Sequence, residues 1–277
     1  MPIYNKFFNY FNDLPIFDLS RLPHREVLSR ICAVFIVIVF LYFKLNSFAE
    51  FPGTLENLTR FFFKLNHRHG TVLFSAHDIQ LIWTFRLSIW ILETSILGGY
   101  ILAYLFRTRA VSVAKGFMEV LFPFMVSILP ILISFAPNNF TEIVPYHSKY
   151  YLAAYTVSAA LIVTGGAINL TGLLTLKKAF AIMSEARFLV TIGIYKYVRH
   201  PLYLGHLIMF LGSLSMRVHG YTLFMYACFV AGQIIRASKE EKKLSEAFPA
   251  YAAYQGTTPM FIPGRLFTGD QKHKTGK

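Results

Sequence analysis

Long apolar runs separated by shorter polar stretches set the pattern of this chain. The runs cover about residues 31–45, 79–106, 117–135, 151–176, 202–216 and 221–235. A helix that crosses a bilayer needs about 20 mostly apolar residues, and several of these runs exceed what a buried helix of a soluble domain requires. The pattern predicts an all-α fold, a polytopic membrane helical bundle with about six transmembrane helices.

The last two apolar runs are separated by only a few residues, which predicts an antiparallel helical hairpin. The run 202–216 is short for an isolated span, so we expect it to continue into its flanks or to tilt little. We divide the chain into N-terminal transmembrane helices with interfacial segments (residues 1–175, about four spans), a C-terminal region that contains the hairpin and an amphipathic tail (176–265), and a basic tail (266–277).

Composition agrees with a membrane protein. The chain has 277 residues, of which 55% are hydrophobic and 15% are charged, and its formal net charge is +13. A soluble domain usually has about a quarter charged residues. The excess of cations could indicate a nucleic-acid partner, but Lys and Arg lie mostly between the apolar runs rather than in one patch. Topogenic charge and attraction to anionic lipid explain it better, so we expect the lipid bilayer, and no nucleic acid, as a partner.

The distribution of cations predicts the topology. Lys and Arg are frequent at the N-terminus, in 107–116, in 177–200 and in the tail, but rare in 136–150 and at the hairpin tip, and intermediate in 46–78. Six spans with both termini in the cytoplasm fit this alternation. The prediction is a multi-pass protein of the plasma or inner membrane, or of the endoplasmic reticulum.

Polar residues within the apolar runs indicate packing or function. Arg86 and Glu93 are seven residues apart, hence on one face of a helix, where a role in contacting other helices and a role in binding a substrate are both open. The small-residue run G-G-A-I-N-L-T-G at 165–172 predicts a helix-packing face, with Asn169 as a cross-helix hydrogen-bonding group.

The sequence predicts no metal site. The candidate ligands in the loop 46–78 are His67, His69, His77 and Asp78. Their spacing matches no familiar metal-ligand pattern, and Arg68 lies between the first two histidines. Cys32 and Cys228 fall inside apolar runs and indicate neither a disulfide framework nor a thiolate site.

The stretch Gly193–Gly205, G-I-Y-K-Y-V-R-H-P-L-Y-L-G, combines ionisable groups with a predicted helix start. Its candidates are Tyr195, Arg199, His200 and Tyr203. Pro201 suits a first helical turn, and a helix start offers free N–H groups and a positive dipole to an anion. His200 and Tyr203 are three residues apart and share a face. From these residues alone, an interfacial anchor with a bystander histidine is an equal alternative.

The second half of the candidate site is R-A-S-K-E-E, residues 236–241. Arg236 and Glu240 are four residues apart and share a helical face, next to Glu241. An ordinary surface pair would stabilise the helix by only a few tenths of a kcal/mol. In the functional interpretation, the guanidinium holds an acceptor carboxylate in a bidentate fork, and a carboxylate binds a cationic or hydroxylated cofactor. An antiparallel hairpin returns residue 236 to the depth of residue 200.

Four motifs in order give a family resemblance. They are R-H-P-L-Y-L-G (199–205), R-x-x-x-E-E-x-x-L (236–244), F-P-A-Y-A-A-Y (248–254) and P-M-F-I-P (259–263), and R-F-L-V-T-x-G-x-Y (187–195) precedes them. Together they resemble the isoprenylcysteine carboxyl methyltransferase family of integral membrane enzymes over about residues 175–265. The sequence departs from the family at the hairpin tip, where Arg217-V-H-G replaces an Asn-Pro, and near Ile182 and Met183, where a polar cofactor residue has no equivalent.

The resemblance implies S-adenosylmethionine as the cofactor, bound at the cytoplasmic end of the hairpin. The implied cofactor-binding residues are Arg187, Phe188, Leu189, Val190, Tyr195, His200, Pro201, Leu202, Tyr203 and Glu240, with the neighbouring Glu241. The position of Arg236 is implied to contact the methyl-accepting substrate and is the candidate catalytic residue.

The predicted function is therefore an integral membrane methyltransferase, similar to protein-S-isoprenylcysteine O-methyltransferases, that acts on a lipophilic or amphipathic acceptor. A carboxylate acceptor needs no general base, whereas a thiol or an ammonium would need His200 or Tyr203. Two alternatives remain, a membrane NADPH-dependent sterol-type reductase and a non-catalytic membrane scaffold of the same fold. The adjacent Glu240 and Glu241 favour the methyltransferase over the reductase, and the presence of both halves of the candidate site speaks against the scaffold.

Overall fold

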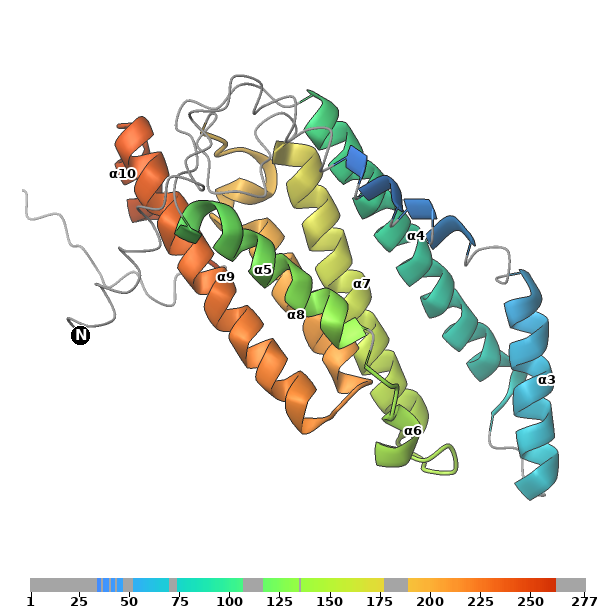
Figure 1. Ribbon diagram of the computed structural model, residues 1–277. Helices are drawn as coiled ribbons and strands as arrows, with labels where there is room; N and C mark the ends of the chain where they lie inside the picture. The colour runs from blue at the N-terminus through green and yellow to red at the C-terminus, as the bar shows by residue number, and fades with distance from the viewer. Residues whose placement is uncertain are drawn as a thin grey trace, which may run out of the picture.

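The computed structural model describes residues 34–46 (except 36, 40 and 43), 52–69, 74–106, 117–134, 136–176 and 189–262. In these residues all regular structure is helical, so the predicted all-α class is confirmed for the described part of the chain (Figure 1). The elements after the helical residues of 34–46 are α3 (Pro52–His69), α4 (Ala76–Phe106), α5 (Phe117–Ser134), α6 (Phe140–Ile143), α7 (Tyr151–Leu176), the 3-10 helix η4 (Gly193–Lys196), α8 (Pro201–Ser215), α9 (Gly220–Ala247) and α10 (Tyr251–Thr257).

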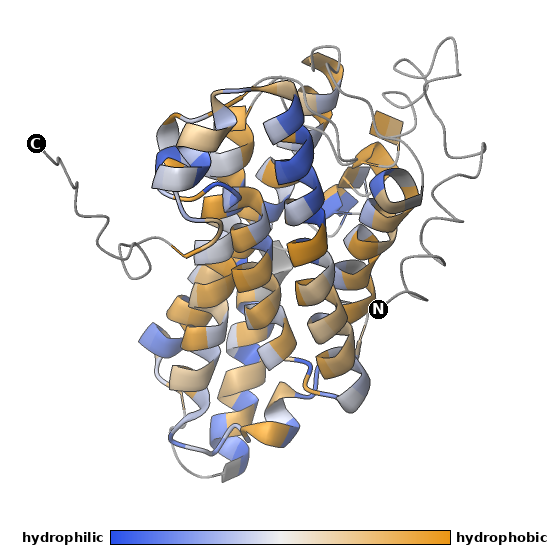
Figure 2. Cartoon of the chain, turned by 90° about the vertical axis from the view of Figure 1, so that its left-hand side faces the viewer, coloured by the Kyte–Doolittle hydropathy of each residue, from blue (hydrophilic) through white to orange (hydrophobic). Residues whose placement is uncertain are grey.

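Two of these helices are long and apolar enough to cross a membrane, α4 with 31 residues and α7 with 26. At about 1.5 Å per residue, both exceed the hydrocarbon thickness of about 30 Å. Helix α8 has 15 residues and is shorter than a usual span, whereas α9 extends well beyond the predicted apolar run 221–235 to Ala247. The count of six spans stays a prediction. Apolar positions follow the middle of the helices, and hydrophilic positions gather toward their ends (Figure 2).

Helices α7 and α8 form the most extensive contact in the described bundle. A Cβ atom added at Gly165 would lie 2.3 Å from the backbone nitrogen of Met209, and one added at Gly205 would lie 2.7 Å from that of Asn169. The two backbones therefore touch, as small residues allow in membrane bundles. The Nδ2 group of Asn169 donates to the carbonyl of Leu202 at 3.3 Å. The predicted packing face and the cross-helix role of Asn169 are confirmed.

This contact gives a stability prediction. Gly165→Ala is expected to destabilise the protein by about 1–3 kcal/mol, because the added methyl group meets backbone that cannot move aside easily. Gly98→Ala is the matched control, because a Cβ at Gly98 meets nothing within 4 Å, and Ala stabilises a helix relative to Gly. Thermal melting in detergent should show a lower midpoint for Gly165→Ala alone. Equal midpoints for both variants would contradict the close packing.

Helix α5 crosses the pair formed by α8 and α9 (Figure 1). Its Glu119 forms an ion pair with Lys243 of α9, with 2.6 Å between Oε2 and Nζ. Farther along, the side chain of Val126 packs so closely on α9 that a Cβ atom at Gly232 would approach it to 2.6 Å. Helix α5 thus contacts α9 both before Arg236, at Gly232, and after it, at Lys243.

The opposite end of the bundle is held by the connection between α8 and α9. The Asn139 side chain accepts from the backbone N–H of Val218 at 2.9 Å and donates to its carbonyl at 2.8 Å. Nε of Arg217 donates to the carbonyl of Ala136 at 3.1 Å. Farther from this connection, the hydroxyl of Tyr226 on α9 donates to the carbonyl of Leu207 on α8, which fixes the two helices relative to one another.

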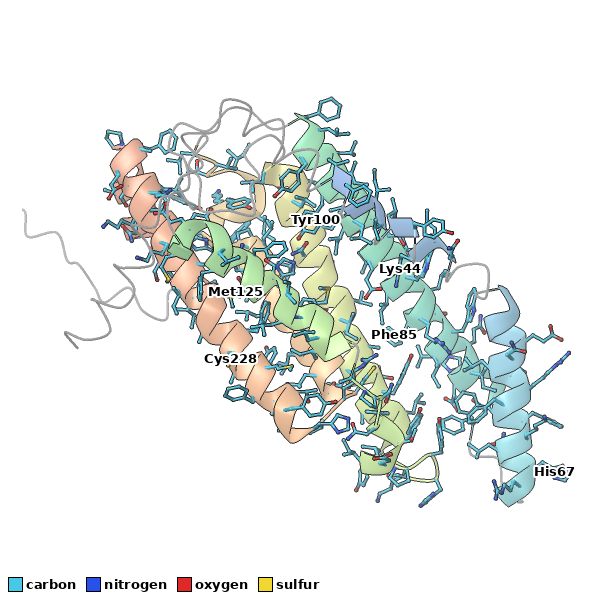
Figure 3. The ribbon with its side chains drawn as sticks, in the orientation of Figure 1. Lys44, His67, Phe85, Tyr100, Met125 and Cys228 are labelled. Atoms are coloured by element: carbon cyan, nitrogen blue, oxygen red, sulfur yellow. The ribbon has the colours of Figure 1, made fainter. Side chains whose placement is uncertain are left out.

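The two charged residues within the apolar helix α4, Arg86 and Glu93, do not pair with one another. Glu93 forms an ion pair with Lys44 of the helical segment 34–46, which lies along α4 (Figure 3). The side chain of Arg86 is exposed. Glu93 therefore has a structural role in joining two helices, one of the two roles left open by the sequence.

Candidate functional site

The predicted site residues gather at one end of the bundle, where η4 precedes the start of α8 and where the polar half of α9 meets α10 (Figure 1). Gly193 begins η4 with φ of +60°, in the left-handed region that favours glycine. The turn buries the ring of Tyr195, and its backbone carbonyl accepts from the hydroxyl of Tyr254 at 2.5 Å. His200 is the N-cap residue of α8 and Pro201 opens its first turn, as the sequence predicted.

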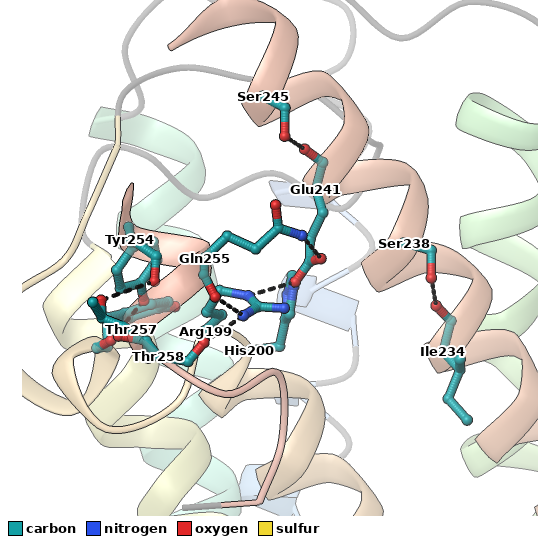
Figure 4. A network of polar contacts seen from close by, with 11 residues as sticks. Arg199, His200, Ile234, Ser238, Glu241, Ser245, Tyr254, Gln255, Thr257 and Thr258 are labelled. Atoms are coloured by element: carbon teal, nitrogen blue, oxygen red, sulfur yellow. Dashed lines mark hydrogen bonds and ion pairs between the residues drawn. The ribbon is translucent and has the colours of Figure 1, made fainter. Parts of the chain in front are cut away.

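Glu241 is the centre of a polar cluster that ties three segments together (Figure 4). Its Oε1 accepts from Nε of Arg199 at 2.7 Å and lies 3.1 Å from Nε2 of His200. Its Oε2 accepts from Nε2 of Gln255 at 3.1 Å. Arg199 also donates from Nη1 to the carbonyls of Gln255 and Thr258. Both oxygens of the carboxylate are therefore engaged by protein groups.

The backbone strengthens the same junction. The N–H groups of Arg199 and His200 donate to the carbonyls of Pro259 and Met260 at 2.9 and 3.1 Å. The P-M-F-I-P segment thus forms backbone hydrogen bonds with the two residues that precede α8. The sequence motifs at 199–205 and 259–263 are therefore in direct contact in the structure. The ring of His200 is held between this pairing and Glu241, and it stacks on Tyr203 with 5.3 Å between centroids.

The charge of Glu241 is stabilised by its partners. Burial alone would raise the pKa of this carboxyl, but the hydrogen bonds from His200 and Arg199, together with their charges, outweigh burial and lower the pKa to about 2. Because the folded-state pKa is below the usual value of 4.5, this group stabilises the fold fully above about pH 4.5 and loses its contribution as the pH falls toward 2.

Glu241→Gln is expected to destabilise the protein at pH 7 by about 3 kcal/mol, because a neutral amide loses the charge that pairs with Arg199 and its NH2 group cannot accept from Nε2 of Gln255. The difference in melting temperature between wild type and variant should shrink as the pH is lowered from 5 toward 3. The matched control is Glu246→Gln on the same helix, where the carboxylate side chain is 63% exposed and pairs only with Lys242. A difference in melting temperature that stays constant with pH would contradict the stabilising role of the ionised Glu241 carboxylate.

Glu240 is placed differently from its neighbour. Its Oε2 accepts from the hydroxyl of Tyr203 at 2.7 Å. In the part of the chain that the structure describes, Oε1 of Glu240 has no hydrogen-bond partner, and it is not a fully buried atom. An ionised carboxylate has about four acceptor positions, so Glu240 can accept from a ligand that bears hydroxyl or ammonium groups.

Arg236 lies one helical turn before Glu240 and is 7% exposed. Its guanidinium lies 5.1 Å above the centre of the Tyr203 ring. Its Nη1 contacts Oε1 of Gln233 at 3.1 Å and Oγ of Ser127, on α5, at 3.4 Å. The cation is thus held over the face of the Tyr203 ring, while Glu240 accepts from the hydroxyl at the edge of the same ring.

The structure brings together most of the residues that the sequence singled out. Within the described chain, Tyr195, His200, Pro201 and Leu202 are buried, Tyr203 and Glu240 are partly buried, and Val190 packs against the cluster that contains Tyr195 and Leu202. Leu189 is also partly buried. Arg187 and Phe188 lie outside the described residues.

Three further residues of the site were not predicted from the sequence. Gln255 follows the F-P-A-Y-A-A-Y motif directly, one turn after Tyr251, so its helical spacing was a usable signal. Ser127 and Gln233 contact Arg236, but neither has a charge or a motif that would distinguish it. Among the described residues, no group of three or more His, Cys, Asp or Glu side chains could hold a metal ion.

Comparison with known proteins agrees with this geometry. Residues 158–246 match the family model of isoprenylcysteine carboxyl methyltransferases. This region belongs to the isoprenylcysteine carboxyl methyltransferase (ICMT) family. No curated protein matched the chain at the significance required.

The ICMT match extends farther toward the N-terminus than the resemblance over 175–265, since it includes most of α7, and it ends before α10. Inclusion of α7 agrees with the close backbone contact between α7 and α8. The ICMT family domain and the apolar helices together identify a membrane protein with a methyltransferase domain.

Proposed function

We propose that the protein transfers a methyl group from S-adenosylmethionine to a carboxylate of a lipophilic or amphipathic acceptor. The observation that supports this most directly is the arrangement of Arg236, Tyr203 and Glu240. A buried cation lies over the face of the Tyr203 ring, and the carboxylate of Glu240, one helical turn farther along α9, accepts from the hydroxyl of the same ring and has a second oxygen available. Such a site can hold an anionic acceptor and a cationic cofactor at the same time.

The cofactor fits the Glu240 side of this arrangement. S-adenosylmethionine bears ribose hydroxyls, an ammonium group and a sulfonium, and the unengaged Oε1 of Glu240 is an acceptor for hydroxyl or ammonium groups. Tyr203 fixes the other carboxylate oxygen, and His200 stacks on Tyr203. We assign Glu241 a positioning role, because Arg199, His200 and Gln255 already occupy both of its oxygens.

When bound, S-adenosylmethionine would supply an electrophilic methyl group, and Glu240, positioned by Tyr203, would hold it beside an acceptor carboxylate at Arg236. The protein has to align the two reactants and exclude water. Arg236 holds the acceptor carboxylate through its planar fork, with Tyr203, Gln233 and Ser127 fixing the guanidinium. A carboxylate is already ionised near neutral pH, so no residue has to remove a proton.

The surroundings support an acceptor with an apolar tail. The site lies at the polar end of helices whose remaining length is apolar, so an amphipathic molecule can place its headgroup at Arg236 while its tail stays in the hydrocarbon region. The cation distribution favours a cytoplasmic position for this end. A reductase or a scaffold is less well supported, because the family match is to methyltransferases and the site retains both charges.

The experiment is methyl transfer by the purified full-length protein in lipid nanodiscs, with S-adenosylmethionine labelled on the methyl group and a series of long-chain acids, thiols and amines. We expect label in the acids only, released as volatile methanol on mild alkaline hydrolysis, because esters are cleaved by base. Label that resists base would exclude a carboxylate acceptor, and absence of label from every acceptor class would remove the support for a methyltransferase.

A further inference from the structure

Helix α5 reaches the Arg236 side of the site from outside the hairpin of α8 and α9 (Figure 1). Three helices contribute to the contacts of the guanidinium. Gln233 belongs to α9 itself, Tyr203 belongs to α8, and Ser127 belongs to α5. The position of the guanidinium therefore depends on where α5 lies relative to the hairpin.

Ser127 is oriented by its own helix before it meets Arg236. Its hydroxyl donates to the carbonyl of Pro123, one turn earlier in α5, at 2.8 Å. Arginine has only donors, so Nη1 of Arg236 donates to Oγ of Ser127 at 3.4 Å. This distance is long for a hydrogen bond, so a small movement of α5 away from α9 breaks the contact.

Gly232 allows α5 to come this close to α9. A Cβ atom at position 232 would lie 2.6 Å and 2.9 Å from the two methyl groups of Val126, the residue that directly precedes Ser127. Valine is restricted at χ1 and cannot easily turn away. Gly232 precedes Arg236 by four residues, so both lie on one face of α9. The missing side chain at Gly232 therefore lets Ser127 reach Arg236.

The cofactor side of the site has hydrogen bonds that are independent of α5. The carboxylate of Glu240 accepts from Tyr203 of α8. Both oxygens of Glu241 are bonded by residues 199, 200 and 255, which lie outside α5. A displacement of α5 at Gly232 therefore disturbs Arg236 and leaves these partners of the two carboxylates in place.

We propose that Gly232 is a positioning residue for the methyl acceptor. It admits α5, and through α5 it places Ser127 so that the Arg236 guanidinium is held in the orientation that binds a carboxylate. Gly232 acts through these two residues and does not touch the acceptor. The proposal rests on the proposed function only in assigning the acceptor carboxylate to Arg236. Binding of an acid can be measured without turnover.

The test titrates the purified full-length protein in nanodiscs with palmitic acid and, separately, with S-adenosylhomocysteine, and subtracts the heat measured with empty nanodiscs. Ser127→Ala should weaken binding of palmitic acid about fivefold, as the loss of one net hydrogen bond predicts. Gly232→Ala should weaken it at least as much. Affinity for S-adenosylhomocysteine should stay within about twofold of wild type in both variants, because α5 does not bond either carboxylate.

Second-site and conservative variants separate positioning from general damage. Val126→Ala removes the two methyl groups that a Cβ at position 232 would meet, so Gly232→Ala combined with Val126→Ala should recover most of the lost affinity for palmitic acid. Ser127→Thr keeps the hydroxyl and should bind palmitic acid more tightly than Ser127→Ala. The matched control is Gly220→Ala on the same helix, where a Cβ meets nothing within 4 Å and binding should equal that of wild type.

Wild-type affinity for palmitic acid in folded Gly232→Ala would overturn the proposal, as would equal loss of palmitic acid and S-adenosylhomocysteine binding. If Gly232→Ala does not fold, Ser127→Ala decides, and wild-type affinity there would overturn the proposal too. Absence of palmitic acid binding by wild type would do the same. If wild type binds no S-adenosylhomocysteine but its binding of palmitic acid depends on Gly232 and Ser127, the proposed function fails and the positioning role stands.

Discussion

Glu240→Ala is expected to weaken binding of S-adenosylhomocysteine by roughly 10-fold to 100-fold, because the variant removes charge-assisted hydrogen bonds to the ligand. It also leaves the hydroxyl of Tyr203 without the acceptor it has at 2.7 Å. Glu240→Gln keeps an acceptor for Tyr203 but loses the negative charge, so its affinity should fall between those of wild type and Glu240→Ala. Calorimetry on the purified protein in nanodiscs measures all three.

The matched control is Glu246→Ala, on the same helix, where the carboxylate lies at the surface. Its affinity for S-adenosylhomocysteine should equal that of wild type. If Glu240→Ala binds the ligand as tightly as Glu246→Ala does, the assignment of Glu240 to the cofactor is wrong, and Glu241 would have to be reconsidered despite its three protein partners.

Arg236→Ala is expected to abolish turnover while affinity for S-adenosylhomocysteine stays within about twofold of wild type. Loss of a buried cation that holds a carboxylate costs about 2–5 kcal/mol, which corresponds to at least about 30-fold in the rate at a fixed acceptor concentration. Arg236→Lys keeps the charge but not the planar fork over Tyr203, so we expect a partial loss. Initial rates with labelled cofactor, combined with calorimetry, separate the two effects.

Lys242→Ala provides the control for Arg236, because it removes a cation from the same helix whose side chain is 74% exposed. It should change neither binding nor turnover. Parallel loss of cofactor affinity and turnover in Arg236→Ala would refute the division of roles between Arg236 and Glu240. Turnover of Arg236→Ala equal to that of wild type would exclude the guanidinium as the acceptor clamp.

Local features of the bundle were predictable because they depend on local pattern. The apolar run 151–176 coincides with α7, since hydrophobic length and helix bounds agree when a helix stays within the membrane. The small-residue run 165–172 identified the face toward α8 because only small side chains permit backbone contact. Pro201 marked the start of α8 for an equally local reason.

The sequence predicted which residues form the site. It did not predict which of them form hydrogen bonds with one another. Motif order and the expected hairpin placed Arg199, His200 and Tyr203 near Glu240 and Glu241. The sequence could not show that Tyr203 selects Glu240 while Arg199 and His200 select Glu241, because adjacent residues on a helix point about 100° apart and their partners depend on tertiary packing. This distinction decides which carboxylate remains available to a ligand.

The contacts of α5 with α9 were not predictable from the sequence. Ser127 reaches Arg236 only because α5 crosses α9, and nothing in the apolar run 117–135 specifies that crossing. Similarly, α9 continues past its apolar run because its polar half packs on other parts of the protein, including the ion pair of Lys243 with Glu119. Helix length then follows from tertiary packing rather than from membrane thickness.

The central claim is that this end of the bundle binds S-adenosylmethionine, and one calorimetric comparison tests it most directly. Purified wild-type protein in nanodiscs is titrated with S-adenosylhomocysteine and, separately, with NADPH. We predict saturable binding of S-adenosylhomocysteine with a stoichiometry of about one and no binding of NADPH. Binding of NADPH alone, or of neither ligand by a folded protein, would contradict the account.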